Sequence, residues 1–87
     1  MNCIYILQSS VNGRFYIGST NDLDRRITEH CVGKTKSLQN LRPLQLVFHQ
    51  EYQTIEQARI IERKLKKLKS RVIIERIIKE GFVSLGS

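Results

Sequence analysis

The chain has 87 residues, a length at which folding buries only about 60 to 65% of the unfolded surface, so we expect one domain over residues 1–87 with a small core. Hydrophobic residues make up 40% and charged residues 26%, which is typical of a globular protein and excludes disordered or collagen-like classes. A net charge of +7 favours a polyanionic partner, above all nucleic acid, because neutralising phosphates releases counterions. The charge count alone fits a solvated basic face equally well.

The first two predicted elements are strands. Residues 2–8 are β-branched and aromatic with little charge, and residues 14–19 repeat this character after the turn signal Asn12-Gly13. Antiparallel pairing across this hairpin would bring Tyr5 and Tyr16 close together, although the sequence leaves the register and face open.

A helix is predicted next, capped by Asn21 or Asp22. Its apolar stripe begins with Leu23, and Arg26 and His30 share the flank of that stripe one turn apart. These two side chains are therefore expected to border the core.

A basic connection over residues 34–42 carries Lys34, Lys36 and Arg42, and residues 44–52 then alternate as a third strand. Thr54 with Gln57 is a capping-box signature that begins a long helix. This helix has an apolar stripe of Ile55, Ala58, Ile61, Leu65 and Leu68.

Ser70-Arg71 breaks this helix, and a last amphipathic helix starting with Val72 is predicted to end near Gly81. Cys3 and Cys31 have neither zinc-site nor redox-pair spacing, so we expect reduced thiols. No run approaches the roughly 18 apolar residues of a membrane span, and a cytoplasmic protein without a membrane partner is expected.

The polar side chains offer the parts of a phosphodiester hydrolase. A tyrosine beside a cation can activate water, Arg26 can grip a phosphate, and His30 can relay a proton. Glu62 suits a single Mg²⁺, since no second carboxylate is positioned with it. Each residue also has a structural interpretation: strand tyrosines pack in sheets, arginines snorkel, and Glu62 can pair with Lys66.

The ordered series of residues resembles the GIY-YIG nuclease family over about residues 2–79. It comprises Ile4-Tyr5, then Tyr16-Ile17-Gly18-Ser19-Thr20-Asn21-Asp22-Leu23-Asp24-Arg25-Arg26 with Glu29-His30, then Arg42-Pro43-Leu44, and finally Glu56, Ala58, Glu62 and Lys66. The likeness is to small single-domain members similar to the N-terminal nuclease domain of the bacterial excision-repair incision subunit.

This resemblance implies an α+β fold, in which a central three-stranded antiparallel sheet is flanked by helices, and metal-dependent hydrolysis of DNA. Tyr5 and Tyr16 stand at the tyrosines of the two motifs, Arg26 at the essential arginine, and Glu62 at the metal-binding glutamate. His30 matches a histidine of some members. The glycine of the first motif is Cys3 here, which is tolerable if only backbone passes there and reduces access if substrate approaches.

The first hypothesis is therefore an endonuclease that uses Mg²⁺ or Mn²⁺ on DNA, including structured or damaged forms met in DNA repair. Either tyrosine would activate water, and Tyr16 is favoured because it lies nearer to Arg26 in sequence. Sequence specificity would be low or would be supplied by a protein partner.

The second hypothesis is a non-catalytic binding module that keeps the fold. The residues expected to contact nucleic acid are Lys34, Lys36, Arg42, Lys66, Lys67 and Lys69. A third hypothesis, an assembly subunit, predicts DNA binding that hardly changes with salt.

Overall fold

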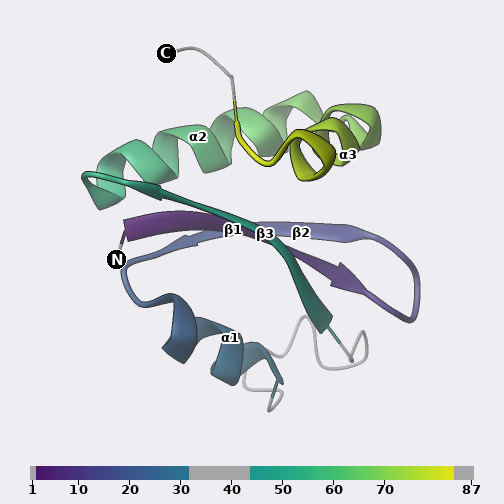
Figure 1. Cartoon of the computed structure of the whole chain (residues 1–87), viewed down its shortest axis with the longest axis horizontal. Helices are drawn as coiled ribbons and strands as arrows, with labels where there is room; N and C mark the ends of the chain where they lie inside the picture. The colour runs from purple at the N-terminus through teal and green to yellow at the C-terminus, as the bar shows by residue number, and fades with distance from the viewer. Residues whose placement is uncertain (1, 32–43, 84–87) are drawn as a thin grey trace.

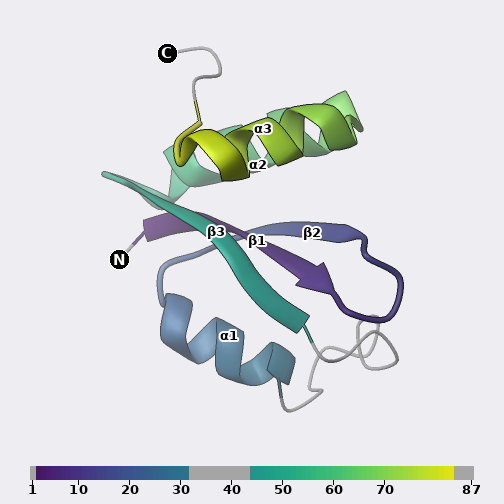
Figure 2. The ribbon, with the colours of Figure 1, turned by 45° about the vertical axis from the view of Figure 1, so that its right-hand side comes forward.

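The computed structural model describes residues 2–31 and 44–83, in which a sheet lies between two layers of helices (Figure 1). Helix α1 (Leu23–Cys31) covers one face of the sheet. Helices α2 (Ile55–Leu68) and α3 (Arg71–Glu80) cover the other face, as the turned view in Figure 2 also shows.

The sheet has three antiparallel strands: β1 (Asn2–Ser9), β2 (Phe15–Thr20) and β3 (Leu44–Tyr52). Their order is β2-β1-β3, so the first strand is central and the other two are edges. The expected α+β fold with a three-stranded antiparallel sheet is therefore confirmed, and the predicted strands match to within one residue at each end.

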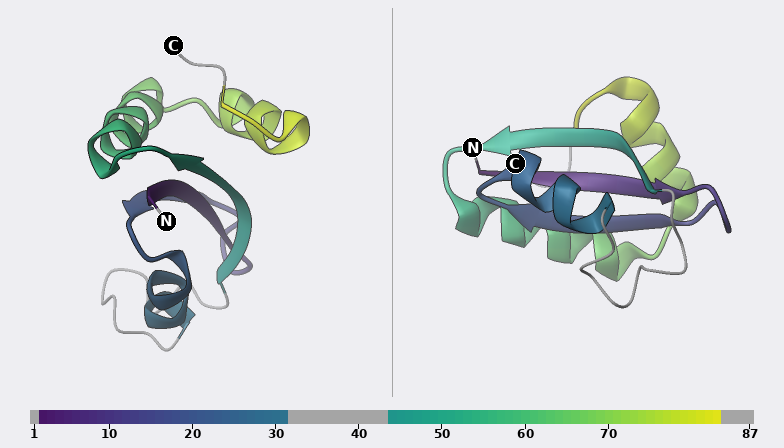
Figure 3. Two further views of the ribbon diagram at one scale, coloured as in Figure 1. Left: turned by 60° about the vertical axis from the view of Figure 1, so that its left-hand side comes forward. Right: turned by 90° about the horizontal axis from the view of Figure 1, so that it is seen from below.

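Alternate residues of β1 are buried on opposite faces of the sheet. Ile4 and Ile6 join the larger core under α2 and α3, whereas Cys3 and Tyr5 pack with Leu23 of α1. Figure 3 shows the sheet sandwiched in this way from two further directions. Because both faces of β1 are covered, the strand reads as a continuous apolar run in the sequence.

The register of the hairpin decides how the two tyrosines lie. Tyr5 is paired with Gly18, and Leu7 with Tyr16. Residues paired directly across a sheet share a face, so both tyrosines lie on the α1 face as diagonal neighbours.

The helix ends follow their predicted caps. Asp22 begins α1, where its Oδ1 accepts a hydrogen bond from the Arg25 amide at 3.2 Å. Thr54 and Gln57 form the predicted capping box of α2, and Ser70 caps α3, which ends at Gly81. Local sequence signals therefore set these boundaries.

Two apolar residues of the predicted amphipathic helices are exposed. Leu68 is 45% exposed and Val72 is 68% exposed. Both lie within three residues of Lys69, the left-handed residue that ends α2 before α3 begins. In the described parts of the chain, no helix is long and apolar enough to cross a membrane.

Candidate active site

An open groove of about 890 Å³ runs along β2, the edge strand nearest α2. The residues that line it come from α1, from the hairpin, from α2, from the turn that joins α2 to α3 and from the start of α3. Tyr5, Tyr16, Arg26 and Glu62 all line this groove, together with Lys66 and Lys69. Tyr5 and Glu62, which are far apart in the sequence, thus line the same groove at one edge of the sheet.

Tyr5 is almost completely enclosed by its neighbours. Only 4% of the residue is exposed, and its ring lies over Gly18 of the adjacent strand. A Cβ atom at Gly18 would lie within 2.7 Å of three atoms of the Tyr5 phenol. The absence of a side chain at Gly18 is therefore what lets the Tyr5 hydroxyl reach the groove.

We expect Gly18→Ala to displace the Tyr5 ring, because real Cβ atoms do not approach other atoms this closely. Overpacking of this kind costs about 1 to 3 kcal/mol of unfolding free energy, which denaturant titration would measure. If the Gly18→Ala protein were as stable as the wild type, the position of the Tyr5 ring would not depend on the absence of a side chain at Gly18.

Arg26 reaches Tyr5 from α1. Its Nε donates a hydrogen bond to the Tyr5 hydroxyl at 3.3 Å, and its Nη1 lies 3.9 Å from Oε1 of Glu29, beyond hydrogen-bond length. The hydrogen bond with Tyr5 raises the pKa of Arg26, whereas its partial burial acts in the opposite direction. The guanidinium is therefore charged and oriented while it borders the groove.

Tyr16 has a different partner. Its hydroxyl accepts a hydrogen bond at 3.1 Å from the side-chain amide of Asn12, in the hairpin turn. Proximity in sequence favoured Tyr16 as the neighbour of Arg26, but the hydrogen bond from Arg26 goes to Tyr5. The two tyrosines thus differ in the charge of the group that contacts their oxygen.

Glu62 enters the groove from α2, on the opposite face of the sheet from α1. Its Oε1 accepts a hydrogen bond from the Ser19 hydroxyl at 2.5 Å, and its Oε2 lies 2.7 Å from Nζ of Lys66. The Glu62 side chain is 19% exposed, so it is half-enclosed and still reachable from solvent. Ser19, on the α2 face of β2, donates to one carboxylate oxygen of Glu62, and Lys66 pairs with the other.

A single carboxylate, that of Glu62, open to solvent on one side fits one hard cation such as Mg²⁺. Mg²⁺ is commonly bound by one or two carboxylates, with waters and substrate phosphates in its other positions. Within residues 2–31 and 44–83, no group of three or more His, Cys, Asp and Glu side chains gathers around a common point. A cation at Glu62 would displace Lys66, whose side chain is 55% exposed, and exposed ion pairs of this kind contribute only about 0 to 1 kcal/mol.

Cys3, which replaces the glycine of the first motif, lies in the core. It is fully buried, packs with Tyr5 and Leu23, and does not line the groove. Burial raises the pKa of its thiol, which keeps it protonated. The cysteine therefore fills space under α1 and does not narrow the groove.

The other predicted residues divide into three groups. Lys66 and Lys69 line the groove, whereas Lys67 is exposed and does not. The His30 side chain and the residues Lys34, Lys36 and Arg42 lie outside the described part of the structure.

Sequence reasoning missed three residues at the groove: Ser19, Arg14 and Arg71. Ser19 follows Gly18 directly, so its place in the second motif was a usable signal. Arg71 had no such signal, because its position depends on how α3 packs against the hairpin.

The fold and the site together define a small nuclease-type domain, and a family model described as the GIY-YIG catalytic domain matches residues 1–76. The chain belongs to the GIY-YIG nuclease family. A UPF0213 protein encoded in the VLF1-GP41 intergenic region of Autographa californica nuclear polyhedrosis virus is 38% identical over 82 residues, covering 88% of this chain and 75% of the viral protein.

A second relative, a UPF0213 protein of Yersinia enterocolitica, is 38% identical over 66 residues, covering 75% of this chain and 67% of the relative. The solution NMR structure of a UPF0213 protein from Bacillus halodurans has a TM-score of 0.58 and 34% sequence identity. The matched region covers 90% of this chain and 82% of the Bacillus halodurans chain. The names of these relatives state no activity.

Proposed function

We propose that this protein is a metal-dependent endonuclease that hydrolyses phosphodiester bonds in DNA. The observation that carries the proposal is the convergence of Tyr5, Arg26 and Glu62, from three different elements, on one open groove. Together they offer a proton acceptor, a cationic phosphate ligand and a carboxylate for a cation. Membership of a nuclease family gives the same class of substrate.

Arg26 is the proposed phosphate ligand. Its Nε is engaged by Tyr5 and the residue lines the groove, where its terminal nitrogens would donate to the oxygens of a phosphodiester. Charge that develops on the phosphoryl oxygens in the transition state would strengthen this contact, and such a contact lowers the barrier to reaction.

Tyr5 is the proposed group that deprotonates the attacking water. The Tyr5 oxygen accepts a hydrogen bond from the cationic Arg26 guanidinium, whereas the Asn12 amide that donates to Tyr16 carries no charge. Tyr16 then helps to position water or phosphate. His30, one turn after Arg26 on α1, is the proposed proton relay.

Glu62 is the proposed ligand of one Mg²⁺ or Mn²⁺. When bound, the cation would supply Lewis-acid stabilisation of the phosphoryl and leaving oxygens. Ser19 holds one oxygen of the Glu62 carboxylate in place, and Lys66 would turn from the other oxygen toward the phosphate.

A second candidate function is a DNA-binding module without turnover. The contact of 2.7 Å between Lys66 and Glu62 favours it, because this lysine already neutralises the carboxylate that a cation would need. In that case the groove would bind a phosphate and leave its bonds intact.

The test is incubation of the protein with single-stranded, duplex, flap and branched DNA, with Mg²⁺, with Mn²⁺ or with EDTA, and with RNA of matched sequence. We expect cleavage of at least one DNA form that depends on the divalent ion. Binding without cleavage of any form would establish the binding module, and the pattern of cleaved forms would define a structure-selective or repair-related substrate. Absence of both binding and cleavage would contradict both proposals.

A further inference from the structure

The groove extends beyond the candidate active site to a second group of cations. Arg14 from the hairpin, Lys69 from the turn after α2 and Arg71 from the first turn of α3 line its other part. Arg14 and Lys69 are exposed, and neither side chain forms an ion pair within the described residues. We call these three residues the basic corner.

Arg71 is held in place by contacts on three sides. Its Nε donates to Glu75 at 2.7 Å, its Nη1 donates to the carbonyl of Gly13 at 3.0 Å, and its guanidinium lies 4.8 Å from the centre of the Phe15 ring. These contacts tie α3 to the hairpin. An arginine with fixed orientation loses little entropy when it binds a phosphate.

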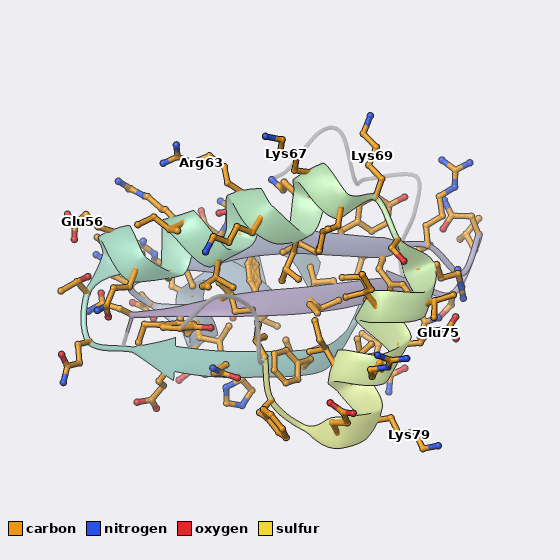
Figure 4. All side chains as sticks on the ribbon, turned by 90° about the horizontal axis from the view of Figure 1, so that it is seen from above. Glu56, Arg63, Lys67, Lys69, Glu75 and Lys79 are labelled. Carbon is orange, nitrogen blue, oxygen red and sulfur yellow. The ribbon has the colours of Figure 1, made fainter. Side chains whose placement is uncertain are left out.

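Lys69 has an unusual backbone for its residue type. It ends α2 in the left-handed conformation, with φ 48° and ψ 38°, a position where glycine is the common residue. Figure 4 shows the side chain projecting outward from the turn between α2 and α3. A lysine thus stands at a position where glycine would have less backbone strain. Non-glycine residues with left-handed backbone conformations are found preferentially at functional sites.

We propose that the basic corner is a second phosphate site, which binds a phosphate further along the DNA strand whose bond is cut. This inference rests on the proposed nuclease function and adds the path of the substrate. The strand would run along β2 from Arg26 and Glu62 to Arg14, Lys69 and Arg71, because one continuous groove joins these residues. A second anchored phosphate would hold the scissile bond in register with the reacting groups.

Lys69→Gly is the most informative variant, because it removes the cation and the backbone strain together. We expect the melting temperature to stay the same or rise, and the affinity for DNA to fall about tenfold, as for one lost charge-assisted hydrogen bond. Affinity would be measured in EDTA, so that no probe is cut, by fluorescence anisotropy of a short labelled DNA single strand and of its duplex.

Lys79→Ala is the matched control. It removes the same charge from an exposed position at the far end of α3, away from the groove (Figure 4), and it should bind as the wild type does. The slope of log affinity against log salt should flatten by about 0.7 for the single strand in Lys69→Gly and stay unchanged in Lys79→Ala.

Equal affinity of Lys69→Gly and wild type, or equal losses in both variants, would overturn the proposal. A loss confined to the duplex would place the contact on the complementary strand and overturn the assignment to the cut strand. Wild-type protein that binds both probes but cuts no DNA would refute the nuclease function and with it the assignment to a cut strand, whereas the basic corner as a phosphate site would still be judged by the binding of the two variants. Wild-type protein that binds neither probe would overturn both.

Discussion

Glu62→Gln should reduce divalent-dependent cleavage of DNA by at least about 10²- to 10³-fold, the cost of removing one preorganised electrostatic group from a reaction centre. The amide keeps the size of the side chain and an oxygen that can accept from Ser19, so α2 and the groove should stay intact. The glutamine side chain lacks the negative charge of the carboxylate, which is what would bind the divalent cation. Cleavage rates under saturating Mg²⁺, with binding measured in EDTA, would check this.

Glu56→Gln is the matched control for that experiment. Glu56 is an exposed acid on the same helix, and Figure 4 places it at the start of α2, far from the turn at Lys69. Its loss should leave cleavage unchanged. If Glu62→Gln cleaved DNA as fast as Glu56→Gln, the carboxylate would be a structural partner of Lys66 and Ser19, and no role in metal binding would remain for it.

The fold could be predicted from the sequence because the local signals agree with the tertiary structure. The capping box at Thr54 and the apolar stripe of α2 are both contained in the short stretch from Thr54 to Leu68, and the strand over residues 44–52 was predicted with its observed bounds. The turn at Lys69 was harder to predict. A non-glycine residue with positive φ has no sequence signature, so the exposure of Leu68 and Val72 on either side of it was missed.

The candidate site could be predicted from the sequence only in part, because its geometry depends on strand register. The sequence identified Tyr5, Arg26 and Glu62 as candidates, but it did not reveal that Tyr5 is paired with Gly18 or that Arg26 donates to Tyr5. Pairing shifted by one residue would have placed the tyrosine on the other face. Arg71 shows the same limit, since its bond to the Gly13 carbonyl joins residues 58 positions apart through packing alone.

The two tyrosines should respond very differently to loss of the hydroxyl. Tyr5→Phe should slow cleavage by about 10²- to 10⁴-fold, the contribution of a general base, because the oxygen held by Arg26 is removed. Tyr16→Phe loses one hydrogen bond with the neutral Asn12 amide, worth about 1 kcal/mol, and should slow cleavage by about tenfold or less. Single-turnover rates at saturating protein would isolate the chemical step from DNA binding.

Both variants keep their rings, so each serves as the control for the other. The Tyr5→Phe ring still fills the space over Gly18 and packs with Cys3 and Leu23, so the protein should fold and bind DNA. A larger loss in Tyr16→Phe than in Tyr5→Phe would assign water activation to Tyr16. The hydrogen bond between Tyr5 and Arg26 would then serve to orient the guanidinium toward the phosphate.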